Sequence, residues 1–295
     1  MADDAIEQVR RFNRTVSERI GALNDRYLGG ARSLGQARVL WEAGPDGCDL
    51  AMLRARLGLD SGYLSRLLRS LQAAGLIRVS QSPRDRRARV VQLTARGRRE
   101  RTTLDKRSDA LAASMLEPLD PSRRERLVRA MVEVERLLTA ASVTIIRVDP
   151  EHDDARNCLA QYTVELNQRS TCRFDPTVGA TALPDELRPP AGNFFVAHLH
   201  GEAVGCGAVK HHADSPAEIK RMWIAPHARG LGLGRRLLDA LEACARDAGA
   251  RIGRIETNSD LIEALSLYTS TGWVEVERFN DEPFADRWLE KTLRE

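Results

Sequence analysis

The stretch EIKRMWIAPHARGLGLGRR, residues 218–236, decides the fold of the C-terminal half of the chain. Its first seven residues predict a strand, and the glycine-rich run after them leads into an amphipathic helix. The apolar face of that helix carries Leu233, Leu237, Leu238, Leu241 and Ala245. A helix that starts directly after such a turn exposes backbone N–H groups and the positive end of its dipole. The stretch therefore predicts a site for a phosphate group.

The spacing of the glycines excludes two common nucleotide sites. A Walker loop requires Gly-Lys-Ser/Thr at the helix start, and a dinucleotide fingerprint requires a third glycine where Arg235 stands. The run R-x-x-G-x-G at residues 229–234 instead resembles the acetyl-CoA pyrophosphate loop of the GNAT superfamily of N-acetyltransferases. The run A-x-x-L-Y-x-x-x-G-W at residues 264–273 is similar to the late motif of that superfamily, and the resemblance covers about residues 143–293.

The GNAT resemblance implies an α/β acyltransferase fold with a mixed central sheet, with acetyl-CoA as cosubstrate and no metal. Met222 and Ile224 are expected to meet the cofactor through their main chain. The other expected cofactor residues are Arg229, Gly230, Leu231, Gly232, Leu233, Gly234, Arg235 and Asn258. One position departs from the family, because many members carry asparagine where this chain has Leu261, with Asn258 nearby.

Two residues are candidates for the chemistry. Tyr268 stands where the family places its general acid, and a phenol with a pKa of about 10 is protonated at neutral pH and can serve a thiolate leaving group. It can instead be a tyrosine that packs against CoA. Glu218 resembles the family's carboxylate base, acting through water, or is a solvated strand residue.

The acceptor pocket is expected from the variable region 155–190 and the last hairpin. The candidates, each of which can instead belong to the core or the rim, are Tyr162, Arg173, Phe174 and Trp288.

Charge is unevenly distributed along the chain. Residues 54–107 hold fifteen basic and four acidic residues, a net +11, so the rest of the chain sums to −8 against a total of +3. A basic block in an otherwise acidic protein indicates a polyanion partner, with DNA the leading candidate. The alternative is a solvated arginine-rich surface.

Two short helices joined by a tight turn lie at the start of this basic block. Asp49 caps the first helix, Gly58 makes the turn, and the second helix, residues 61–74, has leucines on one face and small or basic residues on the other. This is the helix-turn-helix arrangement, in which the second helix enters the major groove. Strands at 76–81 and 89–93 follow as a two-stranded wing tipped with arginine, suited to phosphates or the minor groove.

Several residues of this region carry a second resemblance. L-S-R-L at 64–67, the wing residues Asp85 and Arg87, and L-T-x-x-G at 93–97 resemble the MarR family of regulators, over about residues 6–138. The resemblance implies that the wing aspartate and arginine pair to hold the loop tip. The residues expected to contact double-stranded DNA are Ser61, Gly62, Ser65, Arg66, Arg69, Arg84, Arg86 and Arg89.

The MarR resemblance also implies a homodimer formed through the terminal helices. Apolar stripes on a long helix at 4–27 and at 127–138 fit this role, or belong to an intramolecular core. The last helix leads into a strand at 143–148 without a Gly/Ser or Pro-rich linker. We therefore expect a MarR-like domain at 1–141 and a GNAT domain at 142–295.

The remaining features concern location and metals. No run approaches the ~18 apolar residues of a membrane span, and the N-terminus is charged rather than a signal peptide. The five cysteines have no paired spacing and no histidine partners at ligand intervals. We expect a cytoplasmic protein with reduced thiols and no metal site.

The leading hypothesis is a bifunctional protein, a DNA-binding regulator that also acetylates a primary amine of a small molecule such as an amino acid or amino metabolite. One alternative is that the acetyltransferase fold acts only as a CoA or metabolite sensor for the regulator. Another is a protein-lysine acetyltransferase delivered to DNA. Tyr268 and an intact glycine loop favour an active enzyme over a sensor. The acceptor, the operator, the effector and the sign of regulation stay open.

Overall fold

The computed structural model describes the chain except for residues 1, 82–87, 170–173, 175–181, 213–215 and 294–295. The chain forms two compact units, Met1–Ala130 and Met131–Glu295, which divide within a long helix. The boundary predicted between residues 141 and 142 lies where that helix gives way to a strand, and it stays a prediction. None of the described helices is both long and apolar enough to span a membrane.

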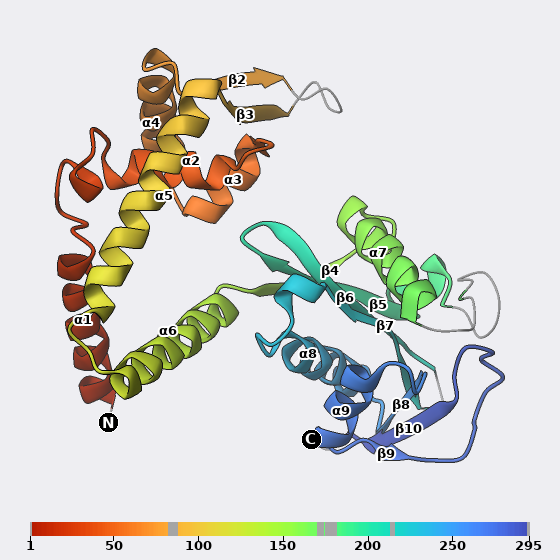
Figure 1. Cartoon of the computed structure of the whole chain (residues 1–295). Helices are drawn as coiled ribbons and strands as arrows, with labels where there is room; N and C mark the ends of the chain where they lie inside the picture. The colour runs from red at the N-terminus through yellow and green to blue at the C-terminus, as the bar shows by residue number, and fades with distance from the viewer. Residues whose placement is uncertain (1, 82–87, 170–173, 175–181, 213–215, 294–295) are drawn as a thin grey trace. The chain divides into compact units, whose positions relative to one another are not determined.

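Short helices and a small sheet enclose the core of the N-terminal unit (Figure 1). These elements are η1 (Tyr27–Gly29), α2 (Leu34–Ala43), β1 (Cys48–Asp49), α3 (Leu50–Leu57), α4 (Ser61–Ala73), β2 (Ile77–Gln81) and β3 (Arg89–Leu93). Side-chain caps set two helix starts. Asp49 accepts a hydrogen bond from the Ala51 N–H at 2.7 Å, and Asp60 accepts one from the Tyr63 N–H at 2.8 Å. The caps place α3 and α4 where the sequence predicted a helix-turn-helix.

The first helix is shorter than predicted. α1 covers Ala2–Arg19, and Gly21 follows it with a φ of 65°, a left-handed conformation that glycine adopts at little cost. Tyr27 lies outside any α-helix and is buried, with its ring edge-on to that of Trp41 at 6.1 Å. The prediction of a single helix over 4–27 is therefore wrong at its C-terminal end. Tyr27 continues the apolar repeat in the sequence, but its side chain packs in the core of the N-terminal unit.

The wing belongs to a three-stranded sheet, ordered β1-β3-β2, rather than to a two-stranded ribbon. The added strand β1 pairs antiparallel with β3, with Cys48 opposite Val91. A strand of two residues carries too little alternation to be recognised from sequence. The wing tip, 82–87, lies outside the described residues, and the predicted pairing of Asp85 with Arg87 lies there too.

Two long helices, α5 (Ala95–Leu116) and α6 (Pro121–Ala141), follow the wing. Thr94 caps α5 by accepting a hydrogen bond from the Gly97 N–H at 3.0 Å. A Cβ on Gly97 would lie 1.9 Å from the carbonyl oxygen of Leu76, so glycine allows α5 to meet the start of the wing. α1 and α6 expose large apolar side chains, namely Ile6, Val9, Phe12, Val16, Val128, Met131, Val132, Leu137 and Leu138.

The C-terminal unit is built on a mixed seven-stranded sheet in the order β4-β5-β6-β7-β8-β10-β9 (Figure 1). The strands are β4 (Thr144–Val148), β5 (Gly192–Leu199), β6 (Glu202–Lys210), β7 (Ala217–Ile224), β8 (Ile252–Thr257), β9 (Val274–Glu275) and β10 (Arg287–Thr292). The helices are α7 (Asp153–Arg169), η2 (Pro184–Leu187), η3 (Pro226–Ala228), α8 (Leu233–Asp247) and α9 (Ile262–Ser270).

Neighbouring residues of β5 pack in two different hydrophobic cores. Phe194 packs in a cluster with Ala155 and Cys158 of α7. Phe195 packs in a second cluster with Leu237, Leu238 and Leu241 of α8. Because neighbouring residues of a strand point to opposite faces, α7 and α8 cover opposite faces of the sheet.

A break in strand pairing positions the site. β7 and β8 run parallel but pair only at Ala217 with Gly253 and at Glu218 with Arg254. On its other side β7 shifts register against β6, and Arg221 within this irregular part has a φ of 58°. Beyond Glu218 the two strands are no longer paired, and the pockets described next lie in this region.

Candidate functional site

The glycine-rich turn lines a pocket at the start of α8. Gly232 is the residue before the helix and has a φ of 75°, and no side chain caps the first amides of α8. These N–H groups are donors without helical partners, as phosphate binding requires. Eight of the ten predicted cofactor residues line this pocket: Met222, Ile224, Arg229, Gly230, Gly232, Leu233, Gly234 and Arg235.

The other two predicted cofactor residues lie elsewhere. The side chain of Leu231 packs, half-buried, against the core next to α7. Asn258 lines the neighbouring pocket, where its Nδ2 donates to the carbonyl oxygen of Phe284 at 2.9 Å and its Oδ1 accepts from the Asp260 N–H at 2.9 Å. The Asn258 side chain therefore holds a loop in this structure.

Arg229 is tied into the loop by its side chain. Its Nε donates to the carbonyl oxygen of Ile224 at 3.0 Å, and its guanidinium pairs with Glu165 of α7 at 2.6 Å. Burial alone would raise the pKa of Glu165, but hydrogen bonds from Arg229, Trp223 and Arg169 hold it below its usual value. Arg229 thus orders the turn, and no local sequence pattern indicates its partner Glu165, which lies 64 residues earlier on α7.

Gly234 allows two helices to approach each other beside this pocket. A Cβ at Gly234 would lie 3.2 Å from the Cδ2 atom of Leu267 in α9. The late motif of residues 264–273 therefore lies against the glycine turn.

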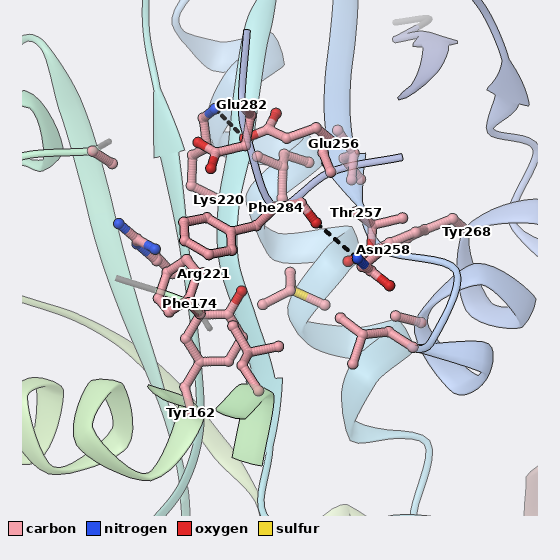
Figure 2. Close-up of a pocket in the computed structure, with 18 residues that line it drawn as sticks. Tyr162, Phe174, Lys220, Arg221, Glu256, Thr257, Asn258, Tyr268, Glu282 and Phe284 are labelled. Atoms are coloured by element: carbon pink, nitrogen blue, oxygen red, sulfur yellow. Dashed lines mark hydrogen bonds and ion pairs between the residues drawn. The ribbon is translucent and has the colours of Figure 1, made fainter. Parts of the chain in front are cut away.

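A second pocket adjoins the first (Figure 2). Tyr268 lines both pockets, as do Tyr162, Met222 and Leu261. The Tyr268 ring is only 4% exposed, and no described residue makes a hydrogen bond with its hydroxyl. Burial raises the pKa of Tyr268 well above its usual value, so the phenol keeps its proton at neutral pH. Tyr268 is therefore a protonated donor at the junction of the two pockets.

A chain of charged residues crosses from β7 to β8. The Lys220 ammonium lies 2.7 Å from Oε2 of Glu218 and also pairs with Oε1 of Glu256. His212 lies 3.0 Å from the other oxygen of Glu218. Lys220 and Glu256 line the second pocket, whereas Glu218, the predicted base, is not among the residues that line either pocket.

The two carboxyls differ in their affinity for a proton. Burial raises the pKa of Glu256, and Lys220 opposes this shift only in part. Burial also acts on Glu218, but Lys220 and His212 hold its pKa below the usual value. Burial disfavours the Lys220 ammonium, yet the two glutamates hold its pKa above the usual value. Carboxyls with divergent pKa values are typical of acid–base sites, and here Glu256 has the raised pKa and lines the second pocket.

Aromatic rings form one wall of the second pocket. Tyr162 and Phe174, two of the acceptor candidates, lie there with ring centroids 5.7 Å apart, and the ring centroid of Phe284 lies 4.9 Å from that of Phe174. Of the other acceptor candidates, Arg173 lies outside the described residues. Trp288 does not line the pocket, because its Nε1 donates to Asn280 Oδ1 at 2.9 Å in the last hairpin.

The exposed face of α4 carries the predicted DNA contacts. The residues exposed there are Ser61, Gly62, Ser65, Arg66 and Arg69, while the leucines of the helix are buried. Arg89, at the start of β3, is exposed and lines a hollow with Ser61 and Ser65. Arg84 and Arg86 lie outside the described residues.

Known proteins resemble both halves of this chain. The model of the acetyltransferase (GNAT) domain matches residues 190–275, and that of the MarR family matches residues 33–88. An IAA acetyltransferase of Azospirillum brasilense is 38% identical over 135 residues, which are 45% of this chain and 86% of that protein. The chain belongs to the GNAT acetyltransferases. The MarR match makes it a MarR–GNAT fusion, as predicted.

Other known proteins are similar to part of this chain. An uncharacterised N-acetyltransferase of Schizosaccharomyces pombe is 30% identical over 146 residues, 48% of this chain and 88% of that protein. A GNAT-family acetyltransferase structure from Staphylococcus aureus aligns with 52% of this chain and 99% of its own, at 17% identity and a TM-score of 0.45.

A GNAT acetyltransferase uses acetyl-CoA, and the residues of the first pocket fit this cosubstrate. The uncapped amides after Gly232 suit a pyrophosphate, and Arg235, 55% exposed at its side chain, adds a cation beside them. Among the described residues, no group of three or more His, Cys, Asp or Glu could hold a metal ion.

Proposed function

We propose that the chain is a DNA-binding regulator whose acetyltransferase domain transfers an acetyl group to the primary amine of a small molecule. The observation that carries the proposal is the position of Tyr268, a protonated phenol that lines both the cofactor pocket and the adjoining pocket. A group in this position can act on an acetyl donor in one pocket and an amine in the other.

The chemistry needs a neutral amine, a polarised acetyl group and a proton for the leaving thiolate. Acetyl-CoA supplies the acetyl group as a thioester. In the proposal Tyr268 donates the proton to the thiolate, and Glu256 takes the proton of the incoming ammonium. Glu218 stays a candidate base, although it does not line the pocket and is linked to it only by its ion pair with Lys220, which also pairs with Glu256.

The lining of the second pocket favours catalysis on a small acceptor over the two alternatives. The second pocket is walled by aromatic rings and holds buried carboxylates, which suits a small amine better than a lysine on a protein surface. A protonated Tyr268 and a proton-accepting Glu256 favour catalysis over sensing alone.

For the MarR domain we propose binding as a homodimer to a pseudo-palindromic duplex, with half-sites about one helical turn apart. Each subunit offers one recognition helix, α4, with an exposed basic face. The apolar side chains exposed on α1 and α6 support dimerisation through these helices.

The test is thiol release from acetyl-CoA by the full chain across a panel of free amino acids, simple amines and lysine peptides. We expect release with free small amines and little with peptides. Release with peptides alone would establish the protein-lysine alternative, and CoA binding without any release would establish the sensor. DNA binding is measured on the same preparation by selection from random duplexes, which should enrich a pseudo-palindrome.

A further inference from the structure

Arg221 is a charged residue of the acceptor pocket that acetyl transfer does not use. It lies in the irregular part of β7, with a φ of 58°, and its guanidinium lies over the Phe174 ring, 5.1 Å from the centroid. It is half-buried, and its guanidinium makes no hydrogen bond or ion pair with any residue that the structure describes. A guanidinium held in a pocket without a carboxylate partner is a site for an anionic group of a ligand.

Two carboxylates of the same pocket have unused acceptor atoms (Figure 2). Oε2 of Glu256 and Oε1 of Glu282 are buried and have no hydrogen-bond partner within the described part of the chain. Lys220 occupies only the other oxygen of Glu256. Because a buried carboxylate oxygen without a donor is costly, these two atoms are suited to an ammonium group of a ligand.

The opposite charges lie around one aromatic side chain. Burial raises the pKa of Tyr162 to about 12, and Arg221, Glu256 and Glu282 all act on its hydroxyl electrostatically. Tyr162, Phe174 and Phe284 form the aromatic wall between them. A ligand in this pocket therefore meets a cation, two carboxylates and an apolar surface within the reach of a small molecule.

We infer that the acceptor is a free α-amino acid with a large apolar or aromatic side chain. Its carboxylate pairs with Arg221, its amino group faces Glu256 and Glu282, and its side chain lies against the rings of Phe174 and Phe284. The inference rests on the proposed acetyl transfer and assigns its substrate class. An amine without a carboxylate would leave Arg221 unpaired, and a lysine side chain would bring no anion to it.

The reaction balances with the groups present. The amino group loses a proton to Glu256, its nitrogen forms the amide bond with the acetyl carbon, and the carbon–sulfur bond breaks. The sulfur leaves with the proton of Tyr268, the second proton lost by the nitrogen restores the Tyr268 phenol, and Glu256 releases its proton to solvent, so the products are the N-acetylamino acid and CoA. Arg221 takes no part in bond making and acts as a specificity-determining residue.

The test compares phenylalanine with 2-phenylethylamine, which has the same ring and amine but no carboxylate. We expect the wild-type chain to acetylate phenylalanine with a kcat/KM roughly 10- to 100-fold higher, because a charge-assisted contact is lost with the amine. Arg221→Gln should raise KM for phenylalanine by a similar factor and leave the constants for 2-phenylethylamine and the KM for acetyl-CoA unchanged. Arg221→Lys should restore part of the loss.

A matched control is Arg278→Gln, since Arg278 also lies over a ring, that of Trp288 at 5.5 Å, but does not line the pocket. This variant should leave the kinetic constants for both substrates unchanged. Equal turnover of the two wild-type substrates, or an unchanged KM for phenylalanine in Arg221→Gln, would overturn the inference.

Failure of the proposed function gives a different result. If acetyl-CoA binds but no amine is acetylated, acetyl transfer is wrong, and calorimetric binding of phenylalanine alone then decides the ligand class. Binding that Arg221→Gln abolishes would support the assignment, and no binding to the wild type would overturn it.

Discussion

Arg66 and Arg221 both lie over an aromatic ring, and yet their surroundings differ. The Arg66 guanidinium is 5.5 Å from the Tyr63 centroid on the exposed face of α4. That of Arg221 is 5.1 Å from the Phe174 centroid, in a pocket between two strands that separate. An exposed arginine works as one of several interchangeable phosphate or base contacts, whereas an enclosed one selects a single ligand group.

This difference predicts larger effects of substitutions in the pockets than on the exposed face of α4. The largest is expected at the glycine turn. Gly232→Asp or Gly234→Asp should abolish acetyl-CoA binding in calorimetry, because a carboxylate would enter the pyrophosphate site and Gly232 has a left-handed φ. DNA affinity should stay within a few-fold.

Gly249→Asp is the matched control for backbone strain. Gly249 has a φ of 91°, follows the other end of α8 and lines neither pocket. This variant should keep acetyl-CoA binding. Unchanged binding in both loop variants would remove the cofactor assignment.

The next largest effect is expected at Tyr268. Tyr268→Phe keeps the ring and removes the hydroxyl, so turnover should fall by roughly 10²–10⁴, the usual contribution of proton transfer, with little change in acetyl-CoA affinity. Tyr162→Phe, which removes a second hydroxyl from the same pockets, is the control and should lose far less. Untouched turnover in Tyr268→Phe would mean that water or another group protonates the thiolate.

Glu256→Gln and Glu218→Gln separate the two candidate bases. A base must be ionised, and burial raises the pKa of Glu256, so wild-type kcat/KM should fall as the pH drops through a value above the ordinary ~4.3 of glutamate. Glu256→Gln should lower kcat/KM roughly 10²-fold and remove this fall of kcat/KM at low pH. Glu218→Gln should lower kcat/KM by less and keep the fall of kcat/KM at low pH. The reverse pattern would restore Glu218 as the base.

The smallest effects are expected on the DNA-binding face. Arg66→Ala should cost about 1–3 kcal/mol of DNA binding and relax sequence preference, and Arg89→Ala should weaken binding to all sequences and lower the salt slope by about 1. Both should leave thiol release unchanged. If Arg66→Ala changes only the salt slope, α4 and the wing have exchanged the roles assigned to them.

Local sequence patterns explain which parts could be predicted from the sequence. The face of α4 follows from helical periodicity, and the glycine turn and Tyr268 follow from short motifs that resemble those of the GNAT superfamily, so none of them needs knowledge of distant residues. The contacts of Arg229 with Glu165 and of Lys220 with Glu256 join elements far apart in the chain, so no local pattern reports them.

The misjudged elements share one cause. Tyr27 fits a helical repeat but packs on Trp41, and β1 forms only because β3 offers it an edge. Arg221 lies in the pocket because the register of β7 against β6 is irregular there, and the neighbouring residues in the sequence do not indicate this irregularity. Tertiary context decided each of these positions.

In the proposed reaction, the shared position of Tyr268 also requires both ligands to be bound at the same time. Because one phenol lines both pockets, both ligands must be present together for the proton to be in place when the acetyl group moves. No cysteine lines either pocket in the described part of the chain, so no thiol there stores the acetyl group. Initial rates at several fixed acceptor concentrations should therefore give intersecting rather than parallel double-reciprocal lines.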